Sequence, residues 1–338
     1  MEIKSHVSLR EYTTFKIGGE AEYFSVVTNL DELKESAKFA LDKNLTVTIL
    51  GGGSNVLVAD EGVSGLVILN QLSGISYEEV AGEIIATVSS GVMLDDLVAD
   101  TVAKEYWGME NLSHIPGTVG ATPVQNVGAY GVEVSDLIVS VDTFNLKTLT
   151  IKKFSNTECN FSYRDSLFKN DEAKNLFITA VSYRLSKKAN PKINYKDLQV
   201  LFGETNPSQR DIRQAVIKIR SNKFPDWSKL GTAGSFFKNP IISRFKAIEL
   251  IKMYPDLPVY PVDEDAVKIS LSWFLDKVLN LRGYTIGPVG TFEKHVLVVV
   301  NQNGNASDVK KFAKYVSDLV LEKLGIELEW EVTQLPCD

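Results

Sequence analysis

The feature that most constrains this fold is a long stretch without charge. Residues 111–132 contain no Asp, Glu, Lys or Arg, although 23% of the 338 residues are charged. The stretch is rich in glycine and other small residues and contains Pro116 and Pro123. Such residues let a backbone approach a large ligand closely, and loops this long are usually functional or disordered. We therefore expect a binding loop; a loop packed for its own sake is the alternative.

Composition narrows the class of protein. The length suggests two or three domains, and 44% hydrophobic residues suit a globular chain with more than one core. The net charge of −7 argues against a general nucleic-acid binder. Two cysteines, Cys159 and Cys337, suggest a reducing compartment. The first residues lack a signal peptide, and the longest aliphatic run, 296–300, is too short to span a membrane. We expect a cytoplasmic protein.

Hydrophobic periodicity predicts an α+β fold with boundaries near residues 65–70 and 220. Helical patterns occupy 30–44, 94–106, 208–221, 244–253, 271–279 and 309–324. Strand patterns occupy 23–27, 46–50, 65–69, 75–80, 83–89, 137–145, 149–154, 177–185, 296–300 and 327–332. The pair 75–80 and 83–89 reads as a hairpin joined at Ala81-Gly82.

Two glycine-rich motifs could bind an anionic cofactor. Gly51-Gly-Gly-Ser-Asn55 follows a strand, and its glycines could turn several N–H groups toward one anion, helped by Ser54 and Asn55. It is neither a dinucleotide fingerprint nor a Walker A loop, and a plain tight turn is the alternative. In the uncharged stretch, free N–H groups and the side chains of Gln125 and Asn126 could contact a ligand.

Two further motifs carry side chains with suitable chemistry. In Phe161-Ser-Tyr-Arg-Asp-Ser-Leu-Phe168, Arg164 could bind a carboxylate; pairing with Asp165 or packing on Phe161 is the alternative. In Gly231-Thr-Ala-Gly-Ser-Phe-Phe-Lys-Asn-Pro240, Ser235 could donate a proton. Its S-x-x-K spacing to Lys238 lacks the companion β-lactamase motifs, and a turn serine is the alternative.

The tail and the histidines yield weaker signals. Strand alternation in Leu328-Glu-Trp-Glu-Val332 would place Glu329 and Glu331 on one face, where glutamates are usually only solvated. His6, His114 and His295 have no zinc spacing, so we expect no metal. His114 could touch a ligand or be structural.

Together, in order, these motifs resemble UDP-N-acetylenolpyruvoylglucosamine reductases over residues 9–332. The resemblance rests on Thr13-Thr-Phe-Lys-Ile-Gly-Gly19, Gly51-Gly-Gly-Ser-Asn55, Ile115-Pro-Gly-Thr-Val-Gly120, Gln125-Asn-Val-Gly-Ala-Tyr-Gly131, Tyr163-Arg-Asp-Ser166, Gly234-Ser-Phe-Phe-Lys-Asn-Pro240 and Leu328-Glu-Trp-Glu-Val332.

The resemblance implies an oxidoreductase of peptidoglycan synthesis, a process tied to cell-wall biogenesis, cell shape and cell division. The family uses NADPH and FAD to reduce UDP-N-acetylglucosamine enolpyruvate to UDP-N-acetylmuramate. It implies a two-subdomain FAD-binding fold of the vanillyl-alcohol-oxidase type plus an α+β substrate-binding domain. We expect these at 1–68 (joined by the C-terminal strand 325–338), 69–222 and 223–324. The expected partner is a UDP-sugar, with no nucleic acid or membrane, and a monomer is one option.

The resemblance also implies roles for individual residues. Arg164, Ser235 and Glu331 match the catalytic positions: Arg164 and a protonated Glu331 would stabilise an enolate-like intermediate, and Ser235 would protonate its α-carbon. The substrate would contact Tyr163, Tyr195, Lys223 and Asn239. The expected FAD contacts are Gly51, Gly52, Gly53, Ser54, Asn55, Ile115, Pro116, Gly117, Thr118, Gly120, Gln125, Asn126, Gly128, Ala129 and Gly131.

Two segments depart from the family pattern. Trp330 stands where the family often has proline, which keeps Glu331 in place but could shift the strand. Residues 287–295 lack the usual histidine near Phe292. Two other readings stay open: a related FAD-dependent carbohydrate or alcohol oxidase, and a non-catalytic nucleotide-binding protein.

Overall fold

The computed structural model describes residues 2–336, so Cys337 lies outside the described residues. Chain contacts divide the protein into two compact units. Unit 1 comprises the chain up to Val7 together with Glu20–Gly53 and Val63–Ser221. Unit 2 comprises Ser8–Gly19, Ser54–Gly62 and the chain from Asn222 onward. Each unit is therefore assembled from segments that are distant in sequence, and the division into three domains stays a prediction.

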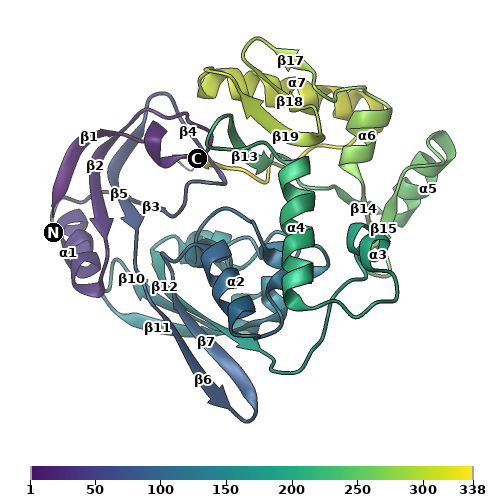
Figure 1. The fold of residues 1–338 in the computed structure, drawn as a ribbon. Coiled ribbons are helices and arrows are strands. Elements are labelled where there is room, and N and C mark those ends of the chain that lie inside the picture. The colour runs from purple at the N-terminus through teal and green to yellow at the C-terminus, as the bar shows by residue number, and fades with distance from the viewer. Residues whose placement is uncertain (1, 337–338) are drawn as a thin grey trace. The chain divides into compact units, whose positions relative to one another are not determined.

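A largely parallel sheet forms the first layer of unit 1. Its strand order is β1-β2-β5-β3, with bounds Ile3–Ser8, Glu20–Val27, Val63–Asn70 and Val47–Leu50. β5 runs parallel to both β2 and β3. Helix α1 (Leu30–Asp42) lies beside the sheet (Figure 1) and buries Leu33, Ala37 and Ala40. Its N-terminus is capped because the Asn29 side chain accepts hydrogen bonds from two backbone N–H groups.

A five-stranded antiparallel sheet forms the second layer of unit 1. Its order is β11-β10-β12-β7-β6, with bounds Ile151–Ser155, Ile138–Asn145, Leu176–Leu185, Glu83–Ser89 and Ile75–Val80. The predicted hairpin of β6 and β7 is confirmed (Figure 1). Alternate residues of β7, namely Ile84, Ala86 and Val88, enter a core shared with helix α2 (Leu94–Ala103).

The remaining elements of unit 1 are short strands and two helices. Strands β8 (Gly128–Ala129) and β9 (Val132–Glu133) pair within the uncharged stretch and its end. Helix α4 (Gln209–Lys223) matches the predicted helix at 208–221. Helix α3 (Lys196–Phe202) was not predicted.

Unit 2 is built around the sheet β13-β19-β18-β17, with bounds Gly231–Ser235, His295–Asn301, Val289–Phe292 and Thr285–Ile286. Helices α7 (Ala306–Leu324) and α6 (Leu271–Lys277) contribute to its core. A second sheet, β14-β16-β15 (Ile241–Ser243, Ala266–Ile269, Val259–Pro261), accompanies helix α5 (Arg244–Met253).

The α+β class is confirmed, but the last predicted strand was wrong. Residues 327–332 form a single bridge, at Trp330, and bend at 331–332, and the strand is β20 (Thr333–Leu335). β20 pairs in parallel with β4 (Val56–Val58) in unit 2. The error arose because the alternation of apolar and polar residues appears in any extended segment, whereas a strand requires a partner along its length.

Candidate cofactor and catalytic sites

The glycine turn after β3 lies against the uncharged stretch in unit 1. A Cβ on Gly51 would lie 2.6 Å from Thr118 Oγ1, and a Cβ on Gly52 would lie 2.9 Å from Gly117 Cα. Gly53 has a φ of +60°, in the region that favours glycine. The two segments expected to bind FAD thus meet backbone to backbone at Gly52 and backbone to side chain at Gly51, with no space for a Cβ at either glycine.

Hydrogen bonds from neighbouring elements of unit 1 hold the uncharged stretch in place. Gly120 N–H donates to the Ser90 carbonyl at 2.8 Å, and the Gly117 carbonyl accepts from Leu94 N–H at 3.0 Å. Thr122 Oγ1 lies 2.7 Å from the hydroxyl of fully buried Tyr183, whose pKa is raised by burial. The segment is therefore an ordered loop anchored on the start of α2 and on β12.

One buried polar atom tests the fit to a cofactor. Thr118 is 4% exposed, and its hydroxyl has no hydrogen-bond partner among residues 2–336. An unmet hydroxyl is costly inside a protein, so a polar ligand atom at this point would satisfy it. Beside a turn that excludes side chains, this hydroxyl fits a phosphate-bearing cofactor such as FAD.

The side chain of Asn126 is buried and hydrogen-bonded within unit 1. It is 1% exposed; Nδ2 donates to Glu133 Oε2 at 2.8 Å and to the Ser162 carbonyl at 3.0 Å. Oδ1 accepts from Ser135 N–H at 3.1 Å. These hydrogen bonds stabilise the loop, and contact between Asn126 and FAD stays a prediction.

Arg164 is held by the uncharged stretch. Its Nη2 donates to the Gly128 carbonyl at 3.1 Å and its Nη1 to the Asn126 carbonyl at 3.4 Å. Its Cζ lies 5.6 Å from the centre of the Tyr163 ring. Arg164 has a φ of +55°, a conformation rare for a residue with a side chain. Unusual backbone at a charged residue is a common mark of a functional site.

Sequence reasoning missed an ionic network that joins α4 to the start of the loop. Arg213 forms a bidentate pair with Asp95, at 2.6 and 3.1 Å, and Asp95 Oδ1 accepts from His114 N–H at 2.6 Å. Arg220 Nε donates to the His114 carbonyl at 2.9 Å. The available signal was the seven-residue spacing of Arg213 and Arg220, which places both on one face of a helix.

The network sets the charge state of its members. Burial acts to raise the pKa of Asp95, but the hydrogen bonds from Arg213 and from His114 N–H outweigh it and leave the pKa below its usual value. Burial, and then the nearby Arg220, lowers the pKa of His114. His114 is therefore neutral near pH 7.

Tyr195 lies beside the same network. The Tyr195 ring packs edge-on against the Tyr130 ring, with centroids 5.2 Å apart, at the N-terminus of α3. Burial raises the pKa of Tyr130 to about 12, so this hydroxyl stays protonated. Tyr195 is 44% exposed.

The segments that carry Ser235 and Glu331 meet in unit 2, although the two residues are 96 positions apart. Glu331 N–H donates to the Phe236 carbonyl at 2.8 Å, and Phe237 bridges to Trp330. Ser235 ends β13 after a break in its register with β19 and follows Gly234 at φ +77°. Such irregularities often re-aim a side chain next to an active site.

Asn55 belongs to the Glu331 segment rather than to the glycine turn. Gly51–Gly53 belong to unit 1, whereas Ser54 and Asn55 belong to unit 2. Asn55 Nδ2 donates to the Glu331 carbonyl at 3.0 Å, and its own carbonyl accepts from Thr333 N–H at 3.0 Å. Its role as a direct FAD ligand stays a prediction.

Three other residues of unit 2 that the sequence analysis named have defined places in the structure: Lys238, Asn239 and Lys223. Lys238 forms an ion pair with Glu329, which agrees with treating the S-x-x-K spacing as accidental. Asn239 Oδ1 accepts from Leu271 N–H at 3.0 Å, at the start of α6. Lys223 is the last residue of α4.

Related proteins cover nearly the whole chain. A UDP-N-acetylenolpyruvoylglucosamine reductase from Neisseria meningitidis serogroup B is 38% identical over 342 residues, or 99% of this chain and 98% of the relative. The protein of that name from Flavobacterium johnsoniae is 39% identical, covering 98% of this chain and 99% of the relative. The chain belongs to the UDP-N-acetylenolpyruvoylglucosamine reductase family. The resemblance inferred from the motifs is thereby confirmed.

Two domain families agree with this UDP-N-acetylenolpyruvoylglucosamine reductase assignment. The family described as "FAD binding domain" matches residues 21–151, and the one described as "UDP-N-acetylenolpyruvoylglucosamine reductase, C-terminal domain" matches residues 226–335. A crystal structure of UDP-N-acetylenolpyruvylglucosamine reductase from Thermus caldophilus matches with a TM-score of 0.70 at 24% identity. It covers 99% of this chain and 100% of that chain, and it supports the fold.

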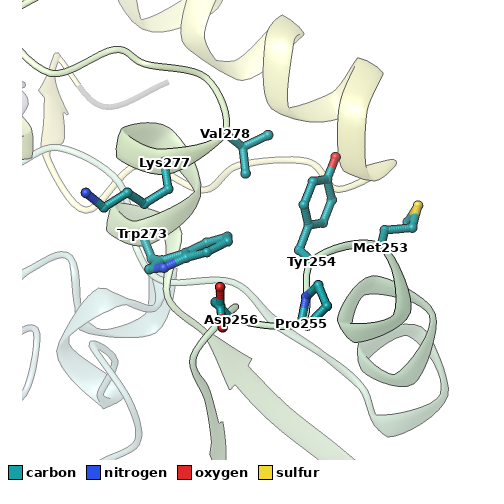
Figure 2. A pocket seen from close by; sticks show the side chains of 7 residues that line it. All are labelled: Met253, Tyr254, Pro255, Asp256, Trp273, Lys277 and Val278. Atoms are coloured by element: carbon teal, nitrogen blue, oxygen red, sulfur yellow. The ribbon is translucent and has the colours of Figure 1, made fainter.

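A hollow in unit 2 lies outside the residues that the reductase motifs single out. Its volume is about 630 Å³, and Figure 2 shows Trp273 and Lys277 extending from α6 and Met253 at the end of α5. The other lining residues are Tyr254, Pro255, Asp256 and Val278. None of the residues expected to be catalytic or to bind substrate or cofactor lines it.

Within residues 2–336, no group of three His, Cys, Asp or Glu side chains is arranged to hold a metal ion. Across the same described part of the chain, no helix combines the length and apolar character needed to cross a membrane.

Proposed function

We propose that this chain reduces UDP-N-acetylglucosamine enolpyruvate to UDP-N-acetylmuramate in peptidoglycan precursor synthesis. The reductant is NADPH, which supplies a hydride; one proton completes the reduction of the enolpyruvyl double bond and NADP⁺ is released. Family membership over nearly the full chain is the observation that carries this proposal. The hydrogen bond that aligns Glu331 with the Ser235 strand supports it.

When bound, FAD would supply the chemistry for hydride transfer from NADPH to the substrate. The residues that hold it are those of the glycine turn and the uncharged stretch, and Thr118 offers its buried hydroxyl to a polar cofactor atom. Backbone N–H groups attract phosphates without a net positive charge on the protein. This accounts for anion binding by a chain of net charge −7.

Three side chains of this chain act on the substrate. Arg164 pairs with the substrate carboxylate and offsets charge that develops beside it. Glu331, in its protonated form, donates a hydrogen bond to the same enolate-like centre. Ser235 Oγ supplies the proton to the α-carbon once the hydride has reached the β-carbon. Tyr163, Tyr195, Lys223 and Asn239 bind the rest of the UDP-sugar, with Lys223 facing its phosphates.

Several broader expectations belong to the same proposal. The chain works in the cytoplasm, without nucleic acid or membrane as partner. Residues 1–68 with 325–338, residues 69–222 and residues 223–324 act as two FAD-binding parts and one substrate-binding part.

The test is an assay of both half-reactions with purified protein. Protein carrying non-covalent FAD should oxidise the NADPH supplied to completion only when UDP-N-acetylglucosamine enolpyruvate is present to reoxidise the flavin. Ser235→Ala should keep flavin reduction by NADPH and lower product formation by about 10²–10⁴-fold. Ser228→Ala, which removes an exposed turn hydroxyl of unit 2, is the matched control. Rapid reaction with O₂ and no use of the enolpyruvyl substrate would instead indicate an oxidase.

A further inference from the structure

The segment that carries Glu331 is joined to the Ser235 strand by very few backbone contacts. Two hydrogen bonds form the junction: Glu331 N–H to the Phe236 carbonyl at 2.8 Å and Lys238 N–H to the Glu329 carbonyl at 2.9 Å. They enclose the single bridge of Phe237 with Trp330. A slip of one residue would turn Glu331 to the opposite face. So short a ladder specifies its register weakly. Asn55 and the β20–β4 pairing hold the other side of the segment, and on the Ser235 side the side chains must supply the rest.

An ion pair joins the two segments on one side of this junction. Lys238 Nζ contacts Glu329 Oε1 directly across the two segments. The Lys238 side chain is only 11% exposed, whereas that of Glu329 is 71% exposed. The lysine stem is packed into the unit, so its ammonium presents a fixed point to which the tail carboxylate attaches. This gives Glu329 a specific contact in place of the purely solvated face expected from its alternation.

An aromatic contact holds the junction at its centre. The Trp330 and Phe236 ring centroids are 4.7 Å apart at an interplanar angle of 61°. Phe236 is fully buried, so it cannot follow a displaced tail. The indole of Trp330 therefore packs on the residue next to Ser235 and ties the tail to a fixed point of the core.

We propose that Lys238, Glu329 and Trp330, here called the tail clamp, are positioning residues that set Glu331 in register with Ser235 for reduction of the substrate. This proposal rests on the function proposed above. The clamp residues themselves do not touch the reacting atoms. Loosening the clamp shifts Glu331 relative to Ser235, and a displacement of about 1 Å can cost about 100-fold in rate. Reduction of FAD by NADPH does not require Glu331 and is therefore spared.

The experiment uses the full-length, FAD-loaded protein and follows the two half-reactions separately by stopped flow. The variants are Lys238→Met, which keeps the apolar stem, Glu329→Gln, and Trp330→Ala with Trp330→Phe as its conservative partner. Lys310→Met, an exposed lysine on α7, is the matched control. We expect reoxidation by UDP-N-acetylglucosamine enolpyruvate to fall about 10–100-fold in Lys238→Met and Trp330→Ala. Flavin reduction should stay within about twofold, and Trp330→Phe should recover most of the rate.

Two further measurements separate positioning from a merely structural role. Hydrogen exchange of the backbone amides in 328–333 should accelerate in the clamp variants and not in Lys310→Met, with or without FAD. Lys238→Met and Glu329→Gln should also be non-additive, because each removes the same ion pair. A charge-reversed pair, Lys238→Glu with Glu329→Lys, should restore part of the rate that either single reversal loses.

Several outcomes would overturn the proposal. Reoxidation within about twofold of wild type in both Lys238→Met and Trp330→Ala would do so, as would equal losses in the two half-reactions. If Lys238→Met failed to fold, the Trp330→Phe and Trp330→Ala comparison would still decide. Wild-type protein that reduces its flavin but is not reoxidised by the enolpyruvyl substrate would contradict the proposed function itself, an outcome distinct from failure of the clamp alone.

Discussion

The two units present their functional residues in opposite ways. In unit 1, the segments expected to hold FAD are defined by missing side chains: Gly51 and Gly52 pack on Gly117 and Thr118 with no space for a Cβ. In unit 2, Ser235 and Glu331 are defined by side-chain chemistry and are aligned by two backbone hydrogen bonds. A binding surface for a large cofactor needs backbone access, whereas a reacting centre needs a few groups at fixed positions. The following changes test this contrast.

Within unit 1, the largest effect should come from Arg164, the one proposed catalytic side chain of that unit. Arg164→Met keeps the apolar stem but removes the charge expected to face the substrate carboxylate. We expect product formation to fall by about 10²–10³-fold, measured as reoxidation of reduced enzyme. Arg184→Met removes an exposed arginine that pairs with Glu83 and serves as the control. A loss below about threefold would contradict the catalytic role.

The next effect concerns the cradle itself. Gly52→Ala places a methyl group 2.9 Å from Gly117 Cα, a backbone atom that cannot yield without moving the loop. We expect FAD affinity, measured by quenching of flavin fluorescence, to fall at least about 10-fold, with about 1–3 kcal/mol lost from stability. Gly82→Ala, at the tip of the β6–β7 hairpin, brings no atom within 4 Å of the added methyl but strains a backbone with φ +84°. It should lose stability and keep FAD affinity, so it controls for destabilisation. Equal FAD affinity in both variants would refute the steric argument.

A pH-dependent effect should arise at Asp95. Its pKa is lowered in the folded protein because the hydrogen bonds from Arg213 and His114 N–H outweigh the effect of burial. A lowered folded pKa contributes stability that is present above the unfolded value of about 4 and is lost as the pH falls through the folded value. Asp95→Asn should therefore lower the free energy of unfolding by about 1–3 kcal/mol at pH 7. We expect the lower part of this range, because one third of the Asp95 side chain is exposed and solvent screens its charge.

Chemical denaturation at several pH values measures this difference. The gap between wild type and Asp95→Asn should be constant above about pH 5 and shrink below about pH 4. Asp96→Asn, at the neighbouring position of α2, is the control. A gap that does not change with acid would mean that the ionised form of Asp95 carries no stabilisation.

The smallest effect, on stability alone, should come from the buried hydrogen bond between Thr122 of the uncharged loop and Tyr183 of β12. Tyr183→Phe removes one hydroxyl of the buried pair with Thr122, while Thr122 keeps its hydrogen bond to the Val119 carbonyl at 2.8 Å. We expect a loss of about 0.5–1.5 kcal/mol in thermal or chemical unfolding and unchanged FAD affinity. A marked loss of FAD would show that this anchor shapes the cradle and would weaken the distinction between packing and binding.

Much of the fold could be predicted because its signals are local. The hairpin of β6 and β7 and helix α5 have the predicted bounds, and α7 follows from its apolar face. Helix α3 was not predicted although the equally short α6 was: α6 buries Leu271, Phe274 and Leu275 on one face, whereas α3 buries only Leu198. The strand predicted at 327–332 failed because its partners, Phe236–Lys238, are remote in sequence and contact it only briefly.

The candidate sites show the same difference between what local sequence indicates and what contacts between remote residues decide. The glycine motifs and the chemical character of Arg164, Ser235 and Glu331 are visible in the sequence. The contacts of Asn126 and Asn55 are not, since an amide suits a ligand, a loop carbonyl and a distant strand equally well. Arg213 and Arg220 were overlooked because charges on a helix usually face solvent, and only folding brings Asp95 and His114 to them.

The sequence by itself determined the α+β class, the family and the types of residue available for binding and chemistry. These depend on composition, local periodicity and ordered motifs, which the chain carries in any conformation. The tertiary structure alone decided that Gly51 and Gly52 pack on Gly117 and Thr118, and that Glu331 is aligned with the Ser235 strand. Such pairings join residues dozens of positions apart, and they exist only once burial and hydrogen bonding repay the entropy of closing the chain between them.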